Sequence, residues 1–169
     1  MYADGGIKVR ATRGIEPGEE IFASYDMCVD CDDAEEYWGT PEILKDFGFL
    51  EGYPHRWVYV DQNIWFVIDQ AETQNGTLEI YFDTEDEESF GIPDVSAISF
   101  MENELKRLEK LGGHFTLSQF PAVPKHEWDT IVDFYQATST ALKMGIAASK
   151  AYHEGGGRVW KEDGFLFFY

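Results

Sequence analysis

Three short apolar segments, followed by two longer segments with helical spacing, limit what this chain can fold into. The short segments, residues 57–60, 64–68 and 77–82, are rich in aromatic and β-branched residues, which favour strands. Asn75-Gly76 is a turn signal between the last two segments. The pattern predicts an α+β protein in which a small sheet precedes two helices.

Both helices have recognisable ends. Asp94 is placed to cap the first and Gly112-Gly113 to stop it, whereas the second should begin near Pro124 and end by Gly155. Their apolar residues recur at helical steps, namely Ile98, Met101, Leu105 and Leu108, then Trp128, Ile131, Tyr135, Leu142 and Ile146. We expect the second stripe to be core and not a ligand site. The apolar tail, residues 164–169, should pack as a terminal strand or against a partner.

The first third of the chain predicts two strands and a short helix. Residues 7–13 and 20–25 should be strands, with a type II turn at residues 16–19, where Pro17 and Gly18 suit the two central positions. In the helix over residues 40–48, Thr40 suits the N-cap, Pro41 the first position and Gly48 a left-handed exit.

Residues 11–26, ATRGIEPGEEIFASYD, are followed after an insertion by residues 44–49, LKDFGF. In this order the two segments resemble the C-terminal motif of a SET domain, and the most similar subgroup is that of the Rubisco lysine methyltransferase. The resemblance covers residues 7–57. It implies that residues 1–57 are the C-terminal part of a SET (β-clip-like) fold and that residues 58–169 are an appended region. The implied activity is S-adenosylmethionine-dependent N-methylation of lysine in a basic or Lys-rich protein.

The resemblance also implies residue roles. Tyr25 matches the catalytic tyrosine that closes the active site, Phe47 an aromatic of the lysine channel, and Phe49 an aromatic that contacts S-adenosylmethionine. The chemistry requires a neutral amine, aligned with the methyl–sulfur bond in a channel that excludes water. Aromatic walls favour the methylated ammonium by cation–π attraction. The alternative for these three residues is an ordinary place in the core.

Two segments that the family needs, a Gly-x-Gly cofactor segment and an Asn-His segment, would precede residue 7, and the sequence as given shows neither. We therefore expect this chain alone to lack S-adenosylmethionine binding and activity. Residues 58–169 also depart from the all-helical C-terminal domain of the Rubisco enzyme, so the resemblance assigns no functional residue there.

Acidic residues dominate the charge of the chain. Thirteen Lys and Arg against 32 Asp and Glu give a net charge of −19, which would repel nucleic acid and steer a basic partner toward the protein. This favours a second interpretation, a non-catalytic acidic protein-interaction module derived from a SET relative. No apolar run reaches the length of a membrane span, so we expect no membrane partner.

The two cysteines, Cys28 and Cys31, lie in an acidic loop, residues 26–36. A single CxxC pair can be half of a zinc site or a redox dithiol, but the four histidines lie far from it in the sequence. We therefore predict no metal site and two free thiols. So few cysteines fit a reducing, intracellular compartment.

Overall fold

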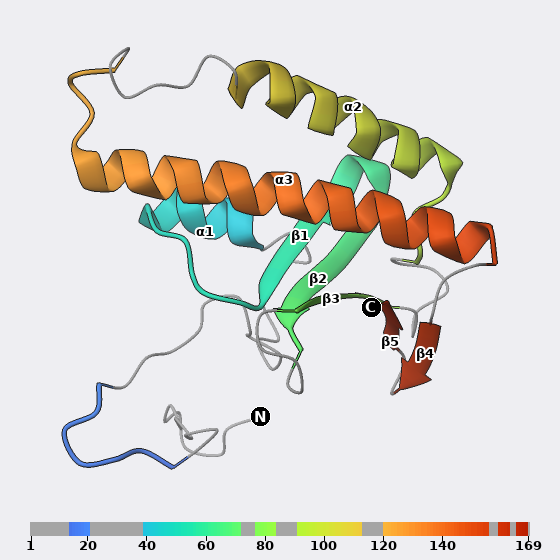
Figure 1. The fold of residues 1–169 in the computed structure, drawn as a ribbon, viewed down its shortest axis with the longest axis horizontal. Helices are drawn as coiled ribbons and strands as arrows, with labels where there is room; N and C mark the ends of the chain where they lie inside the picture. Colours follow the sequence, from blue (N-terminus) through green and yellow to red (C-terminus); the bar gives the residue numbers. More distant parts are fainter. Residues whose placement is uncertain are drawn as a thin grey trace, which may run out of the picture.

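The computed structural model describes residues 14–20, 39–71, 77–83, 91–112, 120–155, 159–162 and 165–168. Within these ranges, two long helices, α2 (Val95–Gly112) and α3 (Lys125–His153), run side by side over a five-stranded antiparallel sheet (Figure 1). A third helix, α1 (Thr40–Phe47), packs against the first strand. The predicted α+β class is confirmed.

The sheet has the order β1-β2-β3-β5-β4. Three of its strands, β1 (His55–Tyr59), β2 (Ile64–Gln70) and β3 (Leu78–Asp83), coincide with the predicted segments, with Trp57 opposite Phe66 and Ile68 opposite Ile80. The apolar tail forms β5 (Phe165–Phe168), which pairs with β3, so the predicted terminal strand is confirmed. The sequence analysis missed β4 (Val159–Glu162), the outer neighbour of β5.

The core lies between the sheet and the two long helices. Phe66 of β2 and Phe82 of β3 are fully buried, with ring centroids 5.8 Å apart, and Met101 of α2 and Leu142 of α3 are buried above them. Gly145 permits a close approach of α3, because a Cβ there would lie 3.1 Å from Met101 Sδ and 3.3 Å from the Phe66 ring. The predicted α3 stripe is only partly core, because Leu142 is buried whereas Ile131 is 39% exposed. The buried face of α3 also includes small residues, namely Ala137, Ala141, Ala148 and Ser149.

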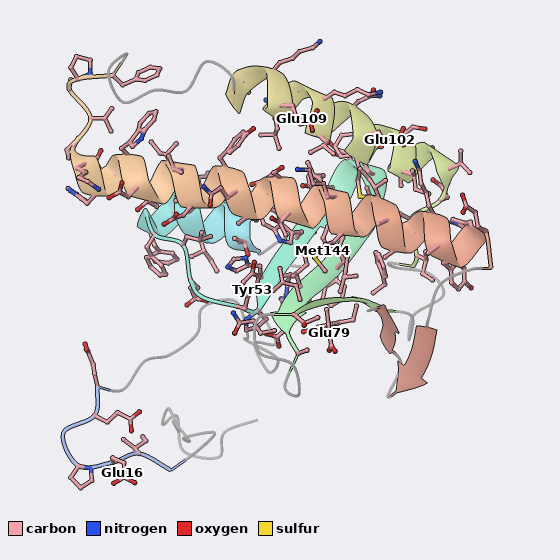
Figure 2. All side chains as sticks on the ribbon, in the orientation of Figure 1. Glu16, Tyr53, Glu79, Glu102, Glu109 and Met144 are labelled. Carbon is pink, nitrogen blue, oxygen red and sulfur yellow. The ribbon has the colours of Figure 1, made fainter. Side chains whose placement is uncertain are left out.

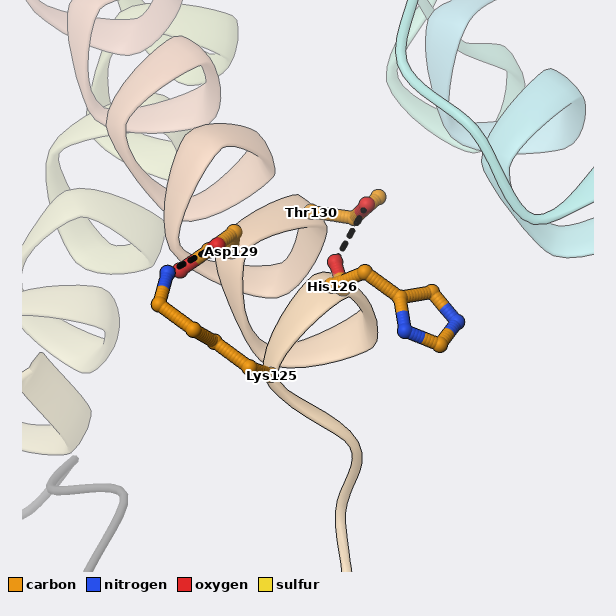
Figure 3. A network of polar contacts seen from close by, with 4 residues as sticks. All are labelled: Lys125, His126, Asp129 and Thr130. Atoms are coloured by element: carbon orange, nitrogen blue, oxygen red, sulfur yellow. Dashed lines mark hydrogen bonds and ion pairs between the residues drawn. The ribbon is translucent and has the colours of Figure 1, made fainter.

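A side chain caps the start of α2, whereas the start of α3 has no side-chain cap. The Asp94 carboxylate accepts hydrogen bonds from the Ala97 N–H at 2.8 Å and the Ser96 hydroxyl at 2.7 Å, which confirms the predicted cap of α2. At the start of α3, Lys125 forms an ion pair with Asp129, and the Thr130 hydroxyl donates to the His126 carbonyl at 3.1 Å (Figure 3). These contacts lie within the first turns of α3, whose N-cap is Pro124, so the helix begins near Pro124 as predicted.

Only part of the predicted N-terminal structure lies within the described residues. At residues 16–19 the Glu19 N–H donates to the Glu16 carbonyl at 3.0 Å and Gly18 has φ +87°, as a type II turn requires. The two strands predicted over residues 7–13 and 20–25 lie outside the described residues. The expected domain boundary after Trp57 falls inside β1, which pairs with β2 along its whole length.

The prediction that Thr40 caps α1 was wrong, because Gly39 is the N-cap and Thr40 is the first helical residue. Gly39 lies directly against β1: a Cβ there would be 2.8 Å from the Arg56 carbonyl oxygen, closer than real Cβ atoms come. The tight contact between helix and strand therefore selects glycine at a position where capping preference alone favours a hydroxyl. Pro41 is consequently the second helical residue and not the first, whereas Gly48 forms the left-handed exit as predicted.

Candidate functional site

The C-terminal end of α1 brings Phe47 and Phe49 together. Gly48 adopts φ +76°, and its N–H donates to the Leu44 carbonyl at 2.8 Å, which reverses the chain after Phe47. The ring centroids of Phe47 and Phe49 are 6.1 Å apart and tilted by 39°. Two of the three residues that the resemblance singled out are therefore neighbours, and the third, Tyr25, lies outside the described residues.

The rings of Phe47 and Phe49 differ in their solvent exposure. Phe47 is 49% exposed, so the alternative of an ordinary core residue is wrong for it, whereas Phe49 is half-buried. About half of the Phe47 surface is therefore accessible to solvent. The pair offers an apolar, aromatic surface and no titratable group of its own.

The segment after Phe49 is held by His55. This residue is buried at the start of β1, and its Nε2 lies 2.9 Å from the Glu51 carbonyl oxygen. Because a carbonyl only accepts, Nε2 carries the proton and donates it. The Tyr53 ring, labelled in Figure 2, packs against the imidazole at 4.3 Å between centroids, and burial raises the pKa of the Tyr53 hydroxyl. These contacts fix the chain between α1 and β1, and we assign His55 a structural role.

A second feature is a cavity of about 500 Å³ between α1, β1, α2 and α3. Its wall is largely apolar and includes Pro41, Trp57, Leu108, Ile131, Phe134 and Leu142. Trp57 is 1% exposed and its ring lies 5.9 Å from that of Phe134. The volume falls within the range of about 300–1,000 Å³ that is typical of small-molecule sites.

The polar groups on the cavity wall include an Arg107–Glu104 ion pair, the Tyr59 hydroxyl and the Trp57 indole N–H. Arg107 donates through both Nε and Nη2 to the same oxygen of Glu104, at 2.8 Å each. Burial, and then the nearby Glu104 carboxylate, raises the pKa of the Tyr59 hydroxyl well above its ordinary value, so the phenol stays neutral. The Trp57 Nε1–H is buried and has no hydrogen-bond partner among the described residues, which ordinarily costs about 1–3 kcal/mol.

Sequence reasoning missed this cavity. Ile131, Tyr135 and Leu142 belong to the stripe that predicted core, yet all three line the cavity and Ile131 is 39% exposed. The expectation of a core position was wrong for Ile131. The available signal was the aromatic content of the stripe, since ligand pockets are enriched in aromatic side chains.

The absence of S-adenosylmethionine binding by this chain alone stays a prediction. Of the residues that the resemblance assigns to the cofactor, they include Phe49, whose half-buried ring supplies one apolar wall and no polar partner for a sulfonium, an amino or a carboxylate group. Among the residues that the structure describes, no three His, Cys, Asp or Glu side chains gather as a metal site would require. Cys28 and Cys31 lie outside these ranges.

No helix in the described ranges is both long enough and apolar enough to cross a membrane. Comparisons of the chain with protein-family models, with curated proteins and with solved structures found no match.

Proposed function

We propose that this chain is the C-terminal part of a SET-type protein-lysine N-methyltransferase. The observation that carries the proposal is the geometry at the end of α1, where Gly48 turns the chain so that Phe47 and Phe49 lie side by side and Phe47 remains half exposed. The resemblance assigns these two positions to the lysine channel and to the cofactor pocket, which are adjacent by necessity in a methyl transfer.

The chemistry of the pair fits that role. Phenylalanine rings carry a negative face that attracts a methylated ammonium, and they exclude water from an amine that must react in its neutral form. Neither ring titrates, so the pair itself introduces no pH dependence. S-adenosylmethionine, when bound, would supply the methyl group. Because the described residues do not complete its site, we assign Phe47 and Phe49 only to the walls and derive no step of the transfer.

The second candidate function is a non-catalytic acidic module that binds a basic partner. It is favoured by the net charge of −19, a field that steers Lys-rich surfaces toward the protein. Under this alternative Phe47 is a contact residue for the partner. The two candidates differ in one measurable product, methyllysine.

The test uses the full natural polypeptide that contains this chain, a Lys-rich protein substrate and radiolabelled S-adenosylmethionine. We expect label in lysine, identified by mass spectrometry of the product. Tyr25→Phe should lower the rate on the order of 100-fold, because it removes a hydroxyl positioned at the reacting centre and keeps the ring. Phe47→Ala should lower the rate less, by opening the channel wall.

Phe120→Ala is the matched control for Phe47→Ala, because Phe120 is 44% exposed, precedes α3 in the chain and stacks on Trp128. It should leave the rate unchanged. Salt-sensitive binding of the substrate without methyllysine, in a protein whose Tyr25→Phe variant binds equally well, would reject the enzyme in favour of the acidic module. Equal effects of Phe47→Ala and Phe120→Ala would remove Phe47 from the channel.

A further inference from the structure

We propose that the cavity between α1, β1, α2 and α3 binds a neutral, largely apolar small molecule that carries a ring system and a hydrogen-bond acceptor. The cavity is a separate site from the Phe47–Phe49 pair, because neither ring lines it. Of α1, the cavity wall takes Pro41, which lies in the first turn, whereas Phe47 is the last residue of the same helix. The proposal therefore stands independently of methyl transfer.

The size and lining of the cavity indicate a ring-bearing ligand. A volume of about 500 Å³ accommodates a molecule of two or three fused rings. Aromatic side chains approach the space from two elements, Trp57 and Tyr59 from β1 and Phe134 and Tyr135 from α3. Such walls favour stacked or edge-on contacts with another ring.

The electrostatics of the wall indicate a neutral ligand. Arg107 is the one cation on the cavity wall among the described residues, and both of its close contacts go to Glu104, so an anion finds no unpaired positive charge. The Glu104 carboxylate is engaged in the same pair, so a cationic ligand gains little either. A charged ligand would lose its hydration on entering the cavity, and the apolar wall offers no interaction that compensates for this loss.

The hydrogen-bond acceptor that we propose for the ligand is inferred from Trp57. This residue forms part of the cavity wall while being almost completely buried, and within the part of the chain that the structure describes its indole N–H has no hydrogen-bond partner. An indole N–H only donates. A carbonyl or ether oxygen on the ligand is the group that would satisfy it after a small adjustment of the ring, and this defines which neutral ligands the cavity prefers.

The test titrates the intact chain with Prodan, a neutral naphthalene dye that carries a ketone, and follows the blue shift of its emission. We expect micromolar binding and binding of anilinonaphthalene sulfonate, an anionic dye of similar size, that is at least tenfold weaker. Val132→Trp places a larger ring at a half-buried position of the cavity wall and should abolish Prodan binding. Asp133→Trp is the matched control, because its neighbouring position is exposed and does not line the cavity.

Leu111→Trp guards against a folding defect in Val132→Trp, since Leu111 lines the cavity at a position that is 40% exposed. It should weaken Prodan binding while the circular dichroism stays that of the parent chain.

Trp57→Phe should weaken Prodan binding about three- to tenfold and leave the binding of the ketone-free dimethylaminonaphthalene unaffected. Absence of Prodan binding, equal binding by Val132→Trp and Asp133→Trp, or equally tight binding of the anionic dye would overturn the neutral-ligand site. Equal losses for the two neutral dyes in Trp57→Phe would overturn the acceptor.

Discussion

At the scale of single residues, Asp94 determines where α2 begins. Its carboxylate is held by the Ala97 N–H and by the Ser96 hydroxyl, and these hydrogen bonds lower the pKa of Asp94 below its ordinary value. A group whose native pKa is lowered stabilises the fold above its unfolded pKa, and this contribution is lost as the pH falls through the lowered value. The cap should therefore matter at neutral pH and fade in acid.

The corresponding prediction is that Asp94→Ala lowers the midpoint temperature of unfolding by a few degrees at pH 7, because an orphan N–H loses its acceptor. The difference in midpoint temperature between Asp94→Ala and the parent chain should shrink as the pH falls from mildly acidic values to the pH at which Asp94 protonates. Asp94→Asn is the control, since its amide oxygen accepts at every pH. Thermal unfolding followed by circular dichroism across this range measures the effect, and a constant Asp94→Ala deficit down to the lowest pH would contradict it.

At the scale of elements, the closeness of α3 to the sheet and to α2 depends on Gly145. A Cβ at this position already meets Met101 Sδ and the Phe66 ring at 3.1 and 3.3 Å, so a long side chain has no room. We predict that Gly145→Leu destabilises the chain by about 1–3 kcal/mol or more, as overpacking of a core does. Urea unfolding measures the change. Lys143→Leu, at an exposed position two residues away on the same helix, should stay near the parent value, and similar losses in both variants would refute the packing argument.

Local pattern explains which elements the sequence could predict. Aromatic and β-branched content defined β1, β2 and β3, and Asp94 and Gly48 defined helix ends, because these signals are set by neighbours in the chain. The N-cap of α1 could not be read this way, because the Arg56 carbonyl that excludes a side chain at Gly39 comes from another element.

The candidate site shows the same difference between features set by neighbours in the chain and features set by tertiary packing. The family resemblance singled out Phe47 and Phe49, and Gly48 sets their arrangement within three residues. The cavity was missed because it depends on how far α2 and α3 stand from β1, a spacing that small residues such as Ala141 and Gly145 set at one end of the helix pair. The helical stripes were identified from large apolar residues, so the buried face of small residues on α3 did not stand out in the sequence.

At the scale of the whole molecule, charge opposes folding. Thirty-two acidic residues against 13 basic ones leave a net charge of −19, and mutual repulsion of this excess destabilises the compact state. Surface ion pairs act in the other direction, for example Lys150 with Glu102 at 2.6 Å and Arg107 with Glu104 at 2.8 Å. Each exposed pair contributes only about 0–1 kcal/mol, so repulsion among the unpaired acids should dominate the response to salt.

We therefore predict that sodium chloride stabilises the chain. Between about 0.01 and 0.1 M salt the screening length falls from about 30 to 10 Å, which shortens the range of repulsion to that of near neighbours. The midpoint temperature of unfolding should rise by several degrees over this interval and level off beyond it, because the remaining short-range pairs are screened less. Choline chloride at equal ionic strength is the control and should act alike, since screening depends on ionic strength and not on a bound sodium ion. A midpoint that is unchanged or falls with salt would show that the ion pairs outweigh the excess negative charge.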